Sequence, residues 1–211
     1  MFKRIALLML CLVATSACAA ADSNAPYTQG QQYFKIDHPE RVSPKGKVEV
    51  VEVFSYGCIH CDMFAPDVEK LRKSLPKGVS FHFVPANFSP AWEPYARAFY
   101  AARELGVLDK THMALFHAKF DQHYPLNSLD DLADFYAREG VDRAKFMAAA
   151  NSVRTDALLK RDDKLVRDWG VNGTPTMIIN GKYRTAALEP DDLLKLTRWL
   201  IQRELKAKAG G

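Results

Sequence analysis

The sequence predicts an α/β domain with a block of helices inserted into it. Three observations support this prediction. A strand–helix–strand order occupies residues 48–84, and a hairpin followed by a helix occupies residues 177–200. Between them lie about eighty residues with helical but no strand periodicity. Because the two strand-containing halves can share one sheet with helices outside it, we expect the helical block, about residues 90–169, to be an insertion.

The first 21 of the 211 residues have the features of a secretory signal peptide. Lys3 and Arg4 precede a short apolar run, and small residues follow up to Ala21. The run is too short to span a membrane. A buried N-terminal helix is the alternative interpretation. Residues 22–211 then suit one domain.

Cys18 raises a second possibility, a lipoprotein anchor. Lipoprotein signals usually place Leu three residues before the cysteine, whereas Thr15 stands there. We therefore expect cleavage near Ala21 rather than lipidation at Cys18.

The charge of the chain argues against a nucleic-acid partner and excludes few other functions. Loss of Lys3 and Arg4 lowers Lys+Arg from 29 to 27, against 25 acidic residues, so the mature net charge is about +2. The charges are interspersed and form no basic patch with aromatic residues between them. We expect no nucleic-acid partner.

The first half of the sheet comes from residues 33–84. Tyr33–Ile36 can form a short strand, and the Pro-rich segment 38–47 is a loop. Val48–Phe54 is apolar on both faces, as expected inside a covered sheet. A helix should follow from Cys58 to Leu75, kinked at Pro66, and the alternating segment Val79–Val84 is the next strand.

The middle of the chain shows five helical segments. Ser128 followed by Asp131 is typical of a helix N-cap. The segments are 94–105, 109–120, the one starting after Ser128, 142–150 and 152–169.

The second half of the sheet is a hairpin. Met177–Ile179 and Lys182–Tyr183 flank Asn180-Gly181, the strongest short turn signal for a hairpin. A helix from Pro190 places Leu193, Leu196 and Leu200 on one face. Residues 22–26 and 206–211 are expected to be frayed ends.

The segment Cys58-Ile59-His60-Cys61 carries the chemistry. Two cysteines at this spacing, opening a helix after a strand, indicate a redox pair. Free N–H groups at a helix start favour a thiolate, the species that reacts with disulfides. Without the signal peptide, Cys58 and Cys61 are the only cysteines left.

A structural zinc site or two buried thiols are the alternatives to a redox pair. Zinc would need two further ligands. None of the six histidines forms a close pair at ligand spacing, so we expect no metal and no organic cofactor.

Gly173-Thr174-Pro175-Thr176 stands just before the strand that opens the hairpin. Together with the upstream cysteine pair, the helical insertion and Asn180-Gly181-Lys182-Tyr183, it resembles the DsbA family of the thioredoxin superfamily. The resemblance covers the mature chain. It implies a thioredoxin-like fold with an inserted helical domain, and a dithiol oxidase that introduces disulfide bonds into secreted proteins.

The resemblance also implies roles for individual residues. Cys58 matches the exposed nucleophile and Cys61 the buried resolving thiol. His60 matches a residue that favours the Cys58 thiolate, by charge or by hydrogen bonding. A surface histidine without a role is the alternative for His60.

Three further positions match the family. Pro175 matches a cis-proline beside the redox pair, and Thr174 offers a free backbone edge to an extended substrate. Glu52 matches an acid beneath the resolving cysteine, where it would accept the proton of Cys61. An ordinary strand-start proline and a solvated strand-end carboxylate are the alternatives for Pro175 and Glu52.

The implied partners are unfolded secreted proteins with reduced cysteines and a DsbB-like membrane quinone reductase. We expect a monomer in the periplasm of a Gram-negative bacterium. A reductase or isomerase, and a peptide-binding chaperone with a vestigial thiol pair, are the alternative functions.

Ile59 stands where the best-known relatives have proline, and Ala65 where they often have an acid. Both differences bear on the redox potential.

Overall fold

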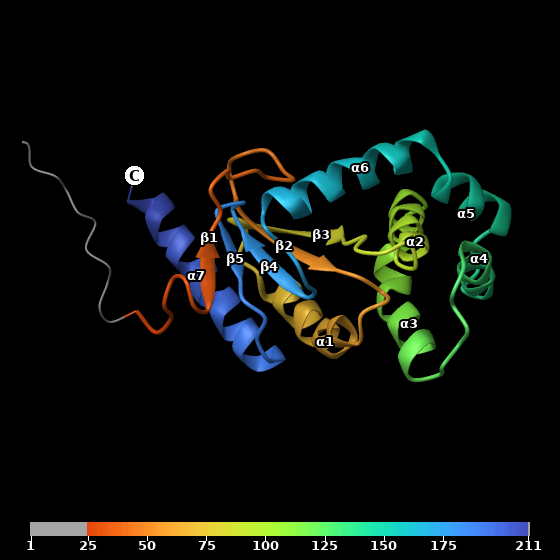
Figure 1. The fold of residues 1–211 in the computed structure, drawn as a ribbon, viewed down its shortest axis with the longest axis horizontal. Helices are drawn as coiled ribbons and strands as arrows, with labels where there is room; N and C mark the ends of the chain where they lie inside the picture. The colour runs from red at the N-terminus through yellow and green to blue at the C-terminus, as the bar shows by residue number, and fades with distance from the viewer. Residues whose placement is uncertain (1–24, 211) are drawn as a thin grey trace, which may run out of the picture.

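The computed structural model describes residues 25–210. The expected signal peptide, Cys18 and Ala21 lie outside this range. Five strands form one mixed sheet in the order β1-β5-β4-β2-β3 (Figure 1). The strands are β1 (Tyr33–Lys35), β2 (Val48–Phe54), β3 (Val79–Pro85), β4 (Thr176–Ile179) and β5 (Tyr183–Thr185).

The sheet joins the two halves of the chain as predicted. β2 pairs with β3 in parallel and with β4 antiparallel, while β5 pairs antiparallel with both β4 and β1. All seven residues of β2 are buried, because helices cover both faces of the sheet. At its centre Glu52 pairs with Phe83 on one side and Met177 on the other.

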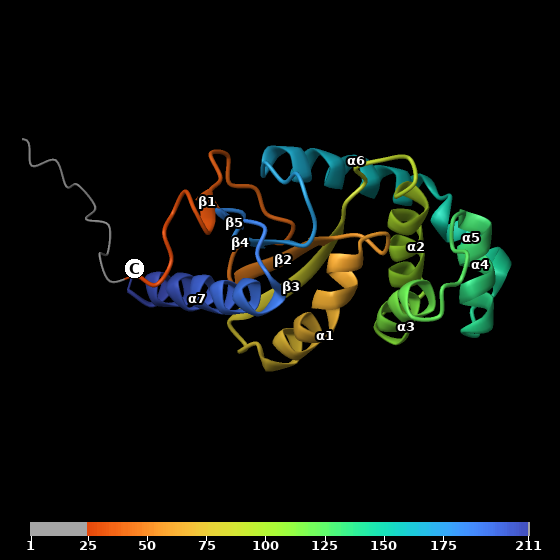
Figure 2. The same ribbon diagram turned by 60° about the horizontal axis from the view of Figure 1, so that its bottom comes forward.

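The described part of the chain has seven helices. α1 and α7 cover one face, and the C-terminal half of α6 covers the other (Figures 1 and 2). The helices are α1 (Ile59–Ser74), α2 (Glu93–Glu104), α3 (Leu108–Phe120), α4 (Leu129–Arg138), α5 (Arg143–Ala150), α6 (Val153–Asp168) and α7 (Pro190–Ala209). Between β3 and β4 the chain forms helices and no strand, as the sequence pattern predicted.

The helical block begins at α2 and lies beyond one end of the sheet (Figure 1). Its starts follow the sequence signals. Ser128 and Asp131 form a reciprocal capping box at α4, and Asp142 and Ser152 cap α5 and α6 through their side chains. α6 belongs to both regions, because Trp169, directly after its end, is buried against the sheet.

One local expectation needs correction. α7 continues to Ala209, so the segment from Lys206 is helical rather than frayed. A hydrogen bond from Lys208 to the Gly46 carbonyl adds a tertiary contact that sequence periodicity does not show. Pro66 lies inside α1, where the sequence predicted a proline within a continuing helix.

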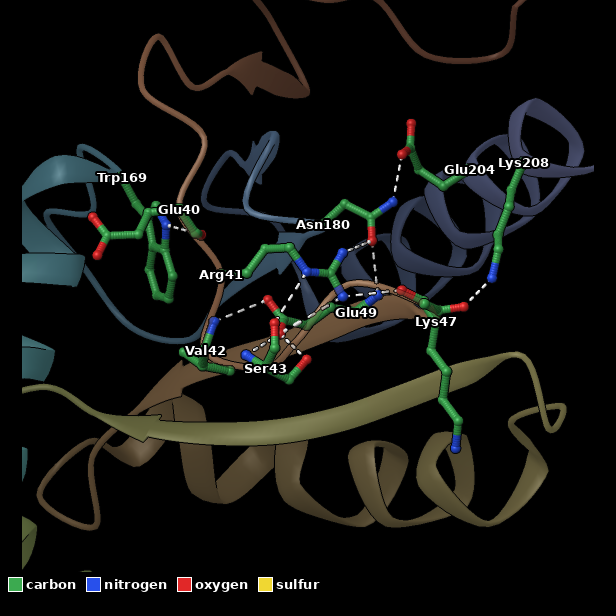
Figure 3. A network of polar contacts seen from close by, with 11 residues as sticks. Glu40, Arg41, Val42, Ser43, Lys47, Glu49, Trp169, Asn180, Glu204 and Lys208 are labelled. Atoms are coloured by element: carbon green, nitrogen blue, oxygen red, sulfur yellow. Dashed lines mark hydrogen bonds and ion pairs between the residues drawn. The ribbon is translucent and has the colours of Figure 1, made fainter. Parts of the chain in front are cut away.

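A buried polar network fixes the loop before β2 (Figure 3). The Glu49 carboxylate is fully buried and accepts hydrogen bonds from the N–H groups of Val42 and Ser43. Arg41 donates to the Asn180 side chain at 2.7 Å, and Asn180 in turn donates to Glu204 of α7. Hydrogen bonds between side chains therefore connect the loop, the β4–β5 hairpin and α7.

No helix within residues 25–210 is both long and apolar enough to cross a membrane.

Candidate active site

The two cysteines lie where β2 passes into α1. Ser55, Tyr56 and Gly57 form a turn that the Cys58 N–H closes by donating to the Ser55 carbonyl at 3.1 Å. Cys58 is the N-cap of α1, and Cys61 lies one turn inside the helix. Both are free thiols in this structure. The sequence therefore places the pair at a helix start, as predicted.

The two thiols differ less in solvent exposure than the sequence suggested. Cys61 is fully buried, and Cys58 is only 9% exposed, so the expectation of a freely exposed Cys58 needs correction. The reason is the loop before β4: the Cys58 thiol donates to the Thr174 carbonyl at 3.3 Å. Cys58 is still the only one of the two that reaches the surface.

The pKa values of the two thiols move in opposite directions. The pKa of Cys58 is lowered to about 5, chiefly by a hydrogen bond from the Cys61 thiol. Burial opposes this shift, while the Thr174 side chain and the N–H groups of Cys61 and His60 support it. The pKa of Cys61 is raised well above 9, mainly by burial. Cys58 is thus the thiolate at neutral pH.

His60 contributes through its backbone rather than its ring. The side chain is exposed, and its imidazole makes no hydrogen bond to any residue that the structure describes. It sits at the second helical position, where the side chain points to solvent while the N–H points toward the helix start. The exposed ring gives no support to a contact between the imidazole and Cys58, and the role of His60 stays a prediction.

Glu52 is buried beneath the pair rather than solvated at a strand end. It is 2% exposed, and its pKa is raised to about 8. Burial is the main cause, with smaller contributions from the negative charges of Cys58 and Glu69, while Arg72 opposes the shift. A carboxyl group with this pKa can exchange a proton near neutral pH.

Thr174 and Pro175 lie beside Cys58, and the peptide bond between them is cis. The Thr174 N–H donates to no backbone carbonyl in the described range. Three exposed apolar side chains form a rim near the redox pair. Ile59, next to Cys58, and Met63 on α1 are 47% and 54% exposed, and Phe88 is 43% exposed and packs on Trp92, whose indole lies against Gly57. The site therefore combines a thiolate, an open backbone edge and an apolar rim.

No cluster of three or more His, Cys, Asp or Glu side chains suited to a metal occurs in residues 25–210.

The sequence reasoning missed the contact between Tyr56 and His112. The Tyr56 hydroxyl lies 2.8 Å from Nδ1 of His112 on α3, and both side chains are buried. One histidine on an apolar helix face gives no motif, so its partner could be found only from the fold.

Comparison with known proteins agrees with this geometry. The model of the DSBA-like thioredoxin domain matches residues 49–197, most of the chain. This chain belongs to the DsbA family. It is a thiol:disulfide oxidoreductase with a thioredoxin-like fold and a helical insertion.

Similar DsbA proteins span nearly the whole chain. A thiol:disulfide interchange protein DsbA of Pseudomonas aeruginosa is 38% identical over 184 residues, 86% of this chain and 87% of its own. The one from Burkholderia cepacia is 37% identical over 186 residues, covering 88% and 87%.

Solved DsbA structures show the same fold. The crystal structure of Pseudomonas aeruginosa DsbA superposes with a TM-score of 0.82 at 38% identity, covering 87% of this chain and 97% of that one. The DsbA oxidoreductase of Xylella fastidiosa has a TM-score of 0.80 at 34% identity, covering 84% and 97%.

Proposed function

We propose that this DsbA-family protein is a dithiol oxidase that acts through the Cys58–Cys61 pair. In the oxidised protein, a substrate thiolate attacks the Cys58 sulfur, and the electron pair of the broken S–S bond goes to Cys61. A second substrate thiolate then attacks the substrate sulfur of the mixed disulfide, and Cys58 leaves as a thiolate. The substrate dithiol is oxidised and the enzyme disulfide is reduced by the same two electrons.

The low pKa of Cys58 beside the raised pKa of Cys61 is the observation that carries this proposal. A thiol with a low pKa leaves readily, so release of oxidised substrate is favoured. A stable thiolate also favours the reduced enzyme, which makes the oxidised enzyme a strong acceptor of electrons.

Glu52 is proposed to take part in proton transfer at Cys61. Because the pKa of Cys61 is raised, the thiolate that forms when Cys61 leaves must take up a proton at neutral pH. A buried carboxyl group with a pKa of about 8 can supply that proton and later accept one when the pair is reoxidised. His60 is proposed to support the Cys58 thiolate through its backbone N–H.

Thr174 and Pro175 are proposed to bind the substrate next to Cys58. The free Thr174 N–H can pair with an extended segment, as in β-strand addition. The apolar rim of Ile59, Met63 and Phe88 suits partly folded chains, which expose apolar side chains. Backbone pairing together with a nonspecific apolar rim predicts little sequence preference.

The setting of the reaction is also a proposal. The N-terminal 21 residues support secretion to the periplasm, with cleavage rather than a lipid anchor at Cys18. Unfolded secreted proteins with reduced cysteines would be the substrates, and a DsbB-like quinone reductase would reoxidise the monomeric enzyme. The thiol pair requires no bound metal or organic cofactor for this exchange.

Oxidative refolding of reduced, unfolded ribonuclease A tests the proposal. Stoichiometric oxidised protein should form disulfides in the ribonuclease and become reduced itself. Cys58→Ser should abolish the reaction. Fast reduction of insulin by dithiothreitol with poor oxidation of ribonuclease would favour the reductase alternative, and suppression of aggregation without thiol exchange would favour the chaperone alternative.

A further inference from the structure

His112 is a buried ionisable side chain that the proposed reaction does not use. It lies on α3 of the helical insertion and is 3% exposed. Aromatic rings surround it, the nearest being Phe83 at 4.5 Å between ring centroids. Phe54 and Phe116 lie at 5.4 Å on other sides. The imidazole is therefore held in one orientation by close packing.

The polar contact of His112 leads directly to the redox pair. Its Nδ1 lies 2.8 Å from the hydroxyl of Tyr56, which is 1% exposed and stands two residues before Cys58. Within residues 25–210, this is the only hydrogen bond of the Tyr56 hydroxyl. A buried hydroxyl without a partner is costly, so the contact holds the tyrosine in place.

Tyr56 in turn belongs to the tight turn from which α1 starts. The Gly57 N–H donates to the Ser55 hydroxyl at 3.0 Å, and the Cys58 N–H donates to the Ser55 carbonyl at 3.1 Å. The direction of the first helical N–H groups depends on this turn. Those of His60 and Cys61 support the Cys58 thiolate.

We propose that His112 is a positioning residue for thiol exchange, which fixes the Ser55–Cys58 turn through Tyr56 and so aims the helix start at the Cys58 sulfur. The helical insertion would then influence the reactivity of Cys58 through α3, in addition to lying beside the redox pair. The inference rests on the proposed role of Cys58.

The contact acts by geometry and not by charge. Burial lowers the pKa of His112 to about 3, the positive charge of Arg72 adds to the effect, and Asp109 opposes it. Burial also raises the pKa of Tyr56 well above 10. Both partners are neutral over the working pH range. A neutral side chain with a polar atom at the Nδ1 position should therefore replace the imidazole.

Four variants separate positioning from packing. Tyr56→Phe removes the hydroxyl and keeps the ring, and His112→Leu removes the partner. His112→Asn keeps a hydrogen-bonding group near the Nδ1 position. Thr111→Val is the matched control, because Thr111 is a fully buried polar neighbour on α3 whose hydroxyl bonds within its own helix, to the Val107 carbonyl.

The readout is the pKa of Cys58, from thiolate absorbance of the reduced protein against pH. We expect Tyr56→Phe and His112→Leu each to raise it by roughly one unit, on the scale of one weakened hydrogen bond to a charged group. The double variant Tyr56→Phe/His112→Leu should raise the Cys58 pKa no further than either single variant, because both changes remove the same hydrogen bond. The Cys58 pKa of His112→Asn should lie close to that of the parent protein, and the Cys58 pKa of Thr111→Val should equal the parent value.

A purely structural role gives a different result. His112→Leu would then lower the denaturant midpoint of the reduced and oxidised forms alike and leave the Cys58 pKa unchanged, which would overturn the inference. If His112→Leu does not fold, Tyr56→Phe alone decides. Failure of the proposed function is distinguishable, because it would appear in the parent protein as a Cys58 pKa near the ordinary value of ~8.5.

Discussion

At the scale of single residues, the account depends on two thiols one helical turn apart having very different acidity. Cys58 has a pKa of about 5, and that of Cys61 is raised by burial. Their positions at a helix start follow from the sequence. The Cys61 thiol and Thr174, which tune Cys58 most, act through distances that only the fold supplies.

Alkylation of the reduced protein should show this difference. At pH 7 iodoacetamide should modify Cys58 and spare Cys61, with a rate that falls as pH drops through about 5. Mixed with a substrate that carries a disulfide, Cys61→Ser should accumulate mixed disulfides: the Cys58 thiolate attacks one substrate sulfur, the other substrate sulfur leaves as a thiolate, and no Cys61 thiol is present to release Cys58. Peptide mapping that found Cys61 the faster-reacting thiol would reverse the proposed roles.

Glu52 should make the reduced protein less stable as pH rises. Its folded pKa of about 8 lies above the unfolded value of ~4.3, so the folded state binds the proton more tightly. This contribution is full below pH ~4 and is lost as pH rises through about 8.

Glu52→Gln should therefore stabilise the reduced protein at pH 8 relative to the parent, by at most about 5 kcal/mol from ~1.36 kcal/mol per unit, and should change little at pH 4. Urea melts at both values test this. Parallel losses of stability in parent and variant would mean that Glu52 keeps an ordinary pKa.

Sequence reasoning at this scale found the residues that belong to motifs. Glu52 was recognisable as a charge in an apolar strand, and its burial excludes the solvated alternative. The exposure of the His60 ring could not be predicted, because side-chain direction at a helix start depends on three-dimensional position. Tyr56 and His112 were missed because their contact joins positions 56 residues apart.

At the scale of elements, the β4–β5 turn connects the hairpin to the rest of the fold. Asn180 and Gly181 both have positive φ, as the predicted two-residue turn requires. The hairpin could be predicted because its signal is local. The close approach of the Glu40 carbonyl to Gly181, by contrast, comes from the distant loop of Figure 3.

Gly181→Ala should be strongly destabilising for two separate reasons. Positive φ alone costs an alanine about 1 kcal/mol. A Cβ at this position would also overlap the backbone of Glu40, which cannot move aside cheaply. Gly140→Ala is the matched control, because Gly140 has a φ of 89° and open space around its Cβ position. Equal shifts of the urea midpoint in the two variants would remove the packing argument.

At the scale of the whole molecule, the order of elements was predictable and the coupling between regions was not. The helical block could be separated from the sheet by its periodicity. That α6 serves both regions, and that α3 reaches the redox turn, depends on tertiary packing. The extension of α7 to Ala209 likewise involves a contact with the loop before β2.

The reduced protein should be more stable than the oxidised protein at pH 7. Cys58 has a folded pKa of about 5 against an unfolded value of ~8.5, so the reduced form gains stability above pH ~8.5 and loses it as pH falls through about 5. The disulfide form lacks this contribution. Paired urea melts at pH 7 and pH 4 should show the difference shrinking at pH 4. An oxidised form that is the more stable at pH 7 would favour the reductase alternative.

The central claim is that the thiolate of Cys58 makes this protein an oxidant, and the redox equilibrium with glutathione tests it most directly. DsbA itself has a potential of about −120 mV and thioredoxin about −270 mV. With Ile59 in the motif and a Cys58 pKa of about 5, we expect a potential above about −180 mV, the value for protein disulfide isomerase. A potential at or below about −230 mV would contradict the account.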